Sequence, residues 1–101
     1  MLDKLSAINE RYLEVEKIIS SPEAMNDMQT YVRLSKEYKD LEPIVDSYKQ
    51  YSNLLANISE AKEILSDSND PEMKDMAKAE LETNLKKKEH LEEEIKFLLI
   101  P

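Results

Sequence analysis

The chain has 101 residues, enough for one compact domain, and it lacks glycine, which disfavours tight hairpins and phosphate-binding loops. Its 22 acidic and 14 basic residues give a formal net charge of −8, which disfavours binding of this chain to free nucleic acid. It has no cysteine, which fits a reducing cytoplasm and argues against disulfides and thiolate metal sites. Its N-terminus carries charges throughout and has no uninterrupted apolar region, which argues against a signal peptide and a membrane span.

The first predicted element is an amphipathic helix over residues 2–19. Leu2 and Ile18 are expected to widen its apolar face. A short helical turn should follow, because Ser21 and Pro22 suit a helix start. The face itself is marked by apolar side chains at alternating intervals of four and three residues, namely Met1, Leu5, Ile8, Tyr12, Val15 and Ile19.

A second, long helix is predicted over residues 26–65. Asn26 and Gln29 have the spacing of a capping box at its start. Pro43 interrupts the hydrogen bonding, and the unbroken periodicity across it favours a kink over a full break. The apolar seam, which shifts its phase after residue 48, consists of Tyr31, Leu34, Tyr38, Leu41, Val45 and Tyr48, and then Tyr51, Leu55, Ile58, Lys62 and Leu65.

A third helix is predicted over residues 71–98. Asp70 is suited to cap it and Pro71 to be its first residue. Two polar residues interrupt the middle of its seam, which weakens the predicted packing there. The seam consists of Ala77, Leu81, Asn84, Lys88, Leu91, Ile95 and Leu98, with Leu85 beside it.

These helices predict an all-α fold with a single domain over residues 1–101. At about 1.5 Å per residue the second and third helices would reach roughly 58 and 42 Å, which favours an elongated antiparallel three-helix bundle, or helical hairpin, with coiled-coil-like packing. The chain ends on an apolar tail. In an up-down-up order, Phe97, Leu98 and Ile100 are expected to shelter against Ile18, Ile19 and Met25, since the end of the third helix would lie beside the end of the first.

No catalytic, cofactor-binding or metal-binding residue is expected. His90 is the only histidine, and Glu93 and Glu94 alone beside it do not make a metal site. The acids Asp40 and Glu42 and the acidic run 92–94 are interpreted as solvated helix faces. The lysines at 86–88 are expected to pair within the helix with Glu82 and Glu89. Consecutive positions fan out around a helix, so the lysines do not form one basic patch.

The tyrosines of the second helix leave two interpretations. Tyr31, Tyr38, Tyr48 and Tyr51 fall on its seam, which favours core residues whose hydroxyls reach a wet rim. The alternative is an aromatic surface for a protein partner.

The order of three segments carries a resemblance to a known family. LSKEYKDLEPIVDSYKQY is followed by SNDPEMKDMAKAEL and then by LEEEIKFLLIP. In this order the chain resembles the N-terminal helical domain of bacterial class I peptide chain release factors, and release factor 1 in particular. The shared features are the Leu-Glu-Pro within the long helix, the Asp-Pro-Glu-Met that starts the third helix, and the closing Leu-Leu-Ile-Pro.

The resemblance implies a role in translation termination at UAG and UAA stop codons. In that family a later domain reads the stop codon, and another uses Gly-Gly-Gln to promote hydrolysis of peptidyl-tRNA. A chain without glycine cannot contain Gly-Gly-Gln, so it is expected to be the non-catalytic first part of a longer protein that continues after Pro101.

The resemblance also implies partners. They are the ribosome, at the stalk base of the large subunit and through a basic ribosomal protein, and the remaining domains of the same factor. It does not indicate which residues contact the ribosome. From the residues alone, the alternative function is a self-associating coiled-coil adaptor or scaffold, in which the seam from Tyr51 to Leu65 pairs with another copy.

Overall fold

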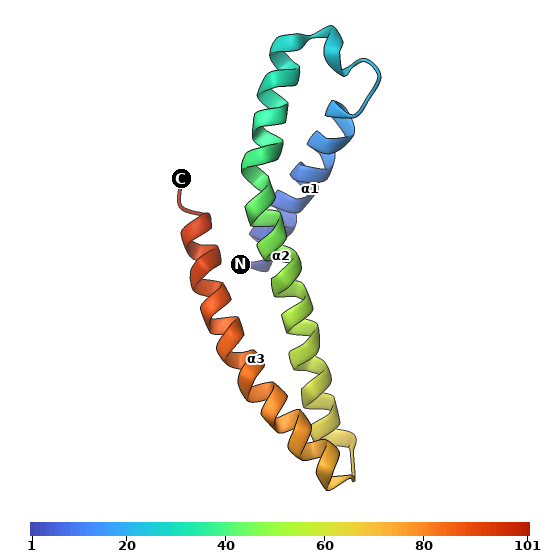
Figure 1. Cartoon of the computed structure of the whole chain (residues 1–101), viewed down its shortest axis with the longest axis vertical. Helices are drawn as coiled ribbons and strands as arrows, with labels where there is room; N and C mark the ends of the chain where they lie inside the picture. Colours follow the sequence, from blue (N-terminus) through green and yellow to red (C-terminus); the bar gives the residue numbers. More distant parts are fainter. The chain divides into compact units, whose positions relative to one another are not determined.

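The computed structural model describes all 101 residues and contains only helices, which confirms the all-α prediction (Figure 1). They are α1 (Leu2–Ile19), a 3₁₀ turn η1 (Ala24–Asn26), α2 (Met28–Asp67) and α3 (Pro71–Leu98). The chain divides into two compact units, Met1–Tyr48 and Lys49–Pro101. The long helix α2 contributes its first half to one unit and its second half to the other. Each unit is described by itself.

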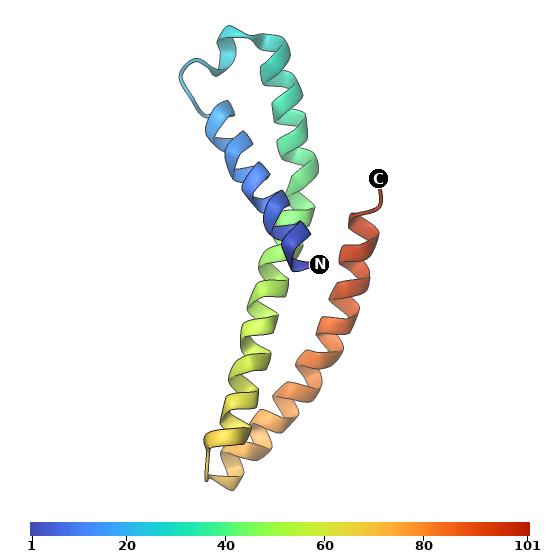
Figure 2. The same cartoon turned by 180° about the vertical axis from the view of Figure 1, so that it is seen from behind.

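In the first unit, α1 and the first half of α2 pack antiparallel, as predicted for consecutive helices (Figure 2). The buried side chains of this unit include Leu5, Val15, Leu34 and Val45. All four fall on the predicted seams, the two in α1 being 10 residues apart and the two in α2 being 11 apart. Leu2 and Ile18 are exposed, so the predicted widening of the α1 face is wrong.

The connection between α1 and α2 uses local side-chain hydrogen bonds. The Ser21 hydroxyl donates to the carbonyl of Ile18 at 2.8 Å, after the end of α1. The predicted helical turn is η1. At the start of α2, the Asp27 carboxylate accepts hydrogen bonds from the backbone N–H and the hydroxyl of Thr30. The cap is therefore Asp27 and not Asn26, which lies inside η1.

Pro43 lies inside α2, and the helix continues through it without ending. A full break at this position is excluded. Proline has no N–H, so the carbonyl of Lys39 loses its helical partner. Pro43 is exposed, which places this loss on the solvent side of the helix. The kink itself stays a prediction.

In the second unit, the second half of α2 turns at residues 68–70 and packs antiparallel with α3 (Figures 1 and 2). Asp70 caps α3 as predicted, accepting a 3.0 Å hydrogen bond from the N–H of Glu72. The buried residues of the unit are Tyr51, Leu54, Ile58, Ala61, Ala77, Leu91 and Ile95.

The seam predicted for the second half of α2 is wrong at two positions. Leu54 and Ala61 are buried where Leu55 and Lys62 were expected, and Lys62 is exposed. The buried positions keep intervals of three and four residues from Tyr51 onward. A small alanine at position 61 allows close approach of the two helices near the turn, which a lysine would not.

The predicted shelter for the C-terminal tail is also wrong. Phe97 is 75% exposed and Ile100 is 67% exposed. Ile95 is fully buried, and a residue two positions further along a helix points about 200° away from it. Phe97 therefore faces away from the core that Ile95 enters.

Candidate functional site

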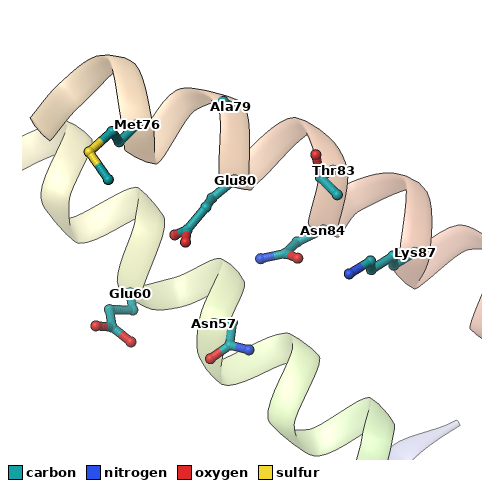
Figure 3. A pocket seen from close by; sticks show the side chains of 8 residues that line it. All are labelled: Asn57, Glu60, Met76, Ala79, Glu80, Thr83, Asn84 and Lys87. Carbon is teal, nitrogen blue, oxygen red and sulfur yellow. The ribbon is translucent and has the colours of Figure 1, made fainter. Parts of the chain in front are cut away.

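A groove of about 630 Å³ opens between the second half of α2 and α3 (Figure 3). It originates from the polar interruption of the α3 seam, because Asn84 occupies a position where a large apolar side chain would otherwise fill the gap. In Figure 3 the side chains of Glu80 and Asn84 extend from α3 toward α2. The lining residues are Asn57, Glu60, Met76, Ala79, Glu80, Thr83, Asn84 and Lys87.

The charged groups of the groove are not used within the chain. Glu60, Glu80 and Lys87 form no ion pair, and the amides of Asn57 and Asn84 form no side-chain hydrogen bond. A charge without an internal partner remains available to another molecule. The charged and amide side chains of the groove therefore add no ion pair and no side-chain hydrogen bond to the packing of α2 against α3.

A second polar cluster joins α1 to α2 in the first unit. The Arg11 guanidinium donates two hydrogen bonds to the Glu37 carboxylate, the one from Nη2 being 2.8 Å long. This bidentate pair lowers the pKa of Glu37, chiefly through the hydrogen bond from Arg11. Nη1 of Arg11 also lies 3.2 Å from Oε1 of Glu14, on the same helix. The cluster is partly exposed, so its contribution to stability is modest.

Of the four tyrosines considered, only Tyr51 is a buried core residue, whereas Tyr31, Tyr38 and Tyr48 are half-buried. The rings of Tyr12 and Tyr38 stack with their centroids 4.4 Å apart. The Tyr38 hydroxyl donates to Glu16 at 2.6 Å, and this hydrogen bond raises the pKa of Tyr38. In the second unit the buried Tyr51 donates to Glu92 at 2.6 Å. These hydroxyls bridge helices instead of facing a partner.

The other residues singled out in the sequence do not come together. His90 is exposed and lies 3.3 Å from Glu94, one helical turn away. No group of three or more histidine, cysteine, aspartate or glutamate side chains is arranged to hold a metal ion. Among the lysines at 86–88, Lys88 places its Nζ 4.0 Å from Oε2 of Glu92. None of the helices has both the length and the apolar character that crossing a membrane requires.

Sequence reasoning missed the groove and the three inter-helix carboxylate contacts, Arg11–Glu37, Tyr38–Glu16 and Tyr51–Glu92. The Arg11–Glu37 pair joins residues 26 apart and Tyr51–Glu92 joins residues 41 apart, so no local spacing reveals them. The one available signal was the pair of polar positions in the α3 seam, Asn84 and Lys88, which indicated weakened packing where the groove opens.

Comparison with known proteins adds a family. The model of the PCRF domain family matches residues 8–101. The chain is 50% identical over its whole length to peptide chain release factor 1 of Cytophaga hutchinsonii, of which it covers 28%. It is 45% identical to the factor of Bacteroides fragilis, covering 27%, and 41% identical to that of Caldicellulosiruptor saccharolyticus, covering 28%. No solved structure matches. The chain thus spans little more than a quarter of these relatives.

Proposed function

Because the chain belongs to the PCRF domain family, we propose that it is the helical accessory part of a peptide chain release factor that directs translation termination at UAG and UAA stop codons. The observation that carries this proposal is the 50% identity to a release factor 1 over all 101 residues. Translation takes place on ribosomes, so the proposed location is the cytoplasm. The ribosome and the remaining parts of such a factor are the proposed partners.

The chain itself would not hydrolyse peptidyl-tRNA. It contains no glycine and so cannot carry the Gly-Gly-Gln sequence on which hydrolysis depends in this family. Its role in termination would be binding and positioning, with catalysis supplied by other parts of the factor.

The proposed binding partner is a basic protein at the stalk base of the large ribosomal subunit. With a net charge of −8, the chain is repelled by ribosomal RNA, whereas a basic ribosomal protein offers the opposite charge. The unpaired carboxylates of Glu60 and Glu80 are examples of exposed acids on its surface. Attraction of this kind weakens as salt screens the charges.

The test is binding of the chain to large subunits with and without the stalk-base protein. We expect binding that requires this protein and weakens at least several-fold when the ionic strength rises from about 0.05 to 0.3 M. Binding that survives removal of the protein, or that is insensitive to salt, would contradict the docking proposal.

The alternative of a self-associating coiled-coil adaptor loses part of its basis, although Leu55 and Leu65 of its seam are only half-buried. That hypothesis required the seam from Tyr51 to Leu65 to be free for a second copy. Tyr51, Ile58 and the neighbouring Leu54 and Ala61 are instead buried within the chain.

A further inference from the structure

All five methionines of the chain lie at its surface, each with between 42% and 66% of its area exposed. Methionine is normally among the residues most often buried, so this distribution is the reverse of the usual one. Most of the leucines and isoleucines, in contrast, are buried or half-buried. The exposed methionines are Met1, Met25, Met28, Met73 and Met76.

The core, in consequence, contains no sulfur. Its side chains belong to leucine, valine, isoleucine, alanine and tyrosine. The chain also has no cysteine that could compete with methionine for an oxidant. Oxidation of methionine to its sulfoxide disrupts a protein chiefly where it places the polar oxygen in a core or an apolar interface. In this chain every thioether that could be oxidised lies outside the core.

The methionines of α3 lie in polar surroundings. Met73 and Met76 are about one helical turn apart near the start of the helix, so they share one of its faces. Met76 lines the groove between α2 and α3, and in Figure 3 its side chain extends from α3 toward α2. Apart from Ala79, the other residues that line this groove are polar or charged. A sulfoxide at Met76 would therefore enter a polar setting.

The methionines before α2 lie beside its cap without taking part in it. Met25 belongs to η1, and Met28 is the first residue of α2. The hydrogen bonds that cap this helix join Asp27 to Thr30 and involve no sulfur atom. Oxidation of Met25 and Met28 should therefore leave the cap intact.

We propose that the exposed methionines are sites of reversible oxidation by hydroperoxides, and that the chain keeps its fold when all of them are oxidised. In each reaction the thioether sulfur attacks one peroxide oxygen, the O–O bond breaks and an S–O bond forms. The proton of the transferred oxygen passes to the departing hydroxide to give water, so sulfur loses two electrons and the peroxide gains them. The proposal concerns the chemistry of this chain alone and is independent of docking on the ribosome.

Hydrogen peroxide suits these sites as an oxidant because it is uncharged. A net charge of −8 repels anionic oxidants but does not hold back a neutral molecule. The reverse reaction is the work of methionine sulfoxide reductases, one for each epimer of the sulfoxide. Such an enzyme must reach the sulfur atom, and exposure at the surface permits this.

The first test measures the oxidation rate of each methionine by mass spectrometry of peptides. The whole chain is treated with dilute hydrogen peroxide, once folded and once unfolded in urea. Because each thioether is already exposed, every rate in the folded chain should lie within about threefold of its rate in urea. Protection of Met76, or of any other methionine, by about tenfold or more would overturn the proposal.

A methionine introduced into the core provides the matched control. Leu91 is 7% exposed, and exchange of leucine for methionine nearly conserves volume, so Leu91→Met should fold. Its new thioether should be oxidised at least about tenfold more slowly than Met76 in the folded chain, and at a similar rate in urea. Leu54→Met is a second core variant of the same kind. Oxidation of both introduced methionines as fast as Met76 would show that exposure does not control the reaction.

The second test examines whether the oxidised chain stays folded and can be repaired. After complete oxidation the mass should have risen by five oxygen atoms, with helicity by circular dichroism unchanged. We expect Tm to fall by less than about 4 °C. Leu91→Met, oxidised in urea and then refolded, should lose markedly more because its sulfoxide lies in the core.

The two sulfoxide reductases, supplied with dithiothreitol, should return the oxidised chain to its original mass. Loss of helicity in the parent chain on oxidation would overturn the proposal, because it would show that the methionines hold the fold together. Sulfoxides that both reductases leave in place would contradict its reversibility.

Discussion

The Tyr51 side chain shows how a single polar contact is built into an apolar seam. Tyr51 is 5% exposed and belongs to the core between α2 and α3, while its hydroxyl donates to the Glu92 carboxylate at 2.6 Å. Lys88, at 4.0 Å from the same carboxylate, is the other charged group near it. Hydrogen bonds to an ionised acceptor are stronger than neutral ones, so this contact outweighs the exposed ion pairs of α3.

Replacing Tyr51 with phenylalanine should lower the free energy of unfolding by about 1–2 kcal/mol, because the partly buried Glu92 loses its donor. Tyr48→Phe is the matched control, since the Tyr48 hydroxyl forms no hydrogen bond and its loss should cost less than about 0.5 kcal/mol. Urea titration followed by circular dichroism measures both.

Burial of Tyr51 and its hydrogen bond to Glu92 also raise the pKa of Tyr51 to about 12. Its contribution is complete below pH 10, the unfolded value, and is lost as the pH rises toward 12, so Tyr51→Phe should lose less stability over that interval than the parent chain. Equal losses in the parent chain and the variant would show that the hydroxyl is not coupled to folding.

At the scale of helices, the start of α3 depends on one side chain. The Asp70 carboxylate accepts a hydrogen bond from the backbone N–H of Glu72. Pro71 is the first residue of the helix, where a backbone N–H would have no helical partner. Asp70→Ala should therefore cost about 1 kcal/mol of stability. Asp67→Ala, three residues earlier, removes a negative charge from the C-terminal end of α2, where it opposes the helix dipole, and should leave stability unchanged or raise it slightly. Thermal unfolding of the two variants distinguishes them, and equal effects of both would mean that the cap does not stabilise α3.

The Asp70 cap, the apolar seam and the groove differ in how far they could be predicted from sequence. The Asp70 cap and the apolar periodicity depend on residues close in the chain, so they can be recognised from spacing alone. The choice between Leu54 and Leu55, or between Ala61 and Lys62, depends on where the partner helix approaches, which no local spacing determines. The groove could not be predicted from sequence for a related reason. Asn57 of α2 and Asn84 of α3 line the same groove only because the two helices pair in this register, which local spacing does not reveal.

For the whole molecule, charge is the property that sequence determines completely. The chain carries 22 acidic and 14 basic residues, a net charge of −8, and has an isoelectric point near 4.7. Mutual repulsion of this excess opposes folding, whereas the ion pairs that favour folding, such as Arg11–Glu37 and Lys96–Glu93, are partly or fully exposed. Exposed pairs contribute little each, so we expect repulsion to be the larger of the two effects that salt screens.

Salt should therefore stabilise this protein at pH 7. Raising sodium chloride from about 10 mM to 1 M shortens the Debye length from roughly 30 Å to 3 Å, which screens the repulsion among the excess carboxylates. We expect a rise in Tm of about 4 °C, which corresponds to roughly 1 kcal/mol for a domain of this size. The control is the same measurement at pH 4.7, where the net charge is near zero and the rise should largely disappear. A fall in Tm with salt at pH 7 would show that the ion pairs outweigh the repulsion, and an equal rise at both pH values would mean that salt acts on apolar burial instead.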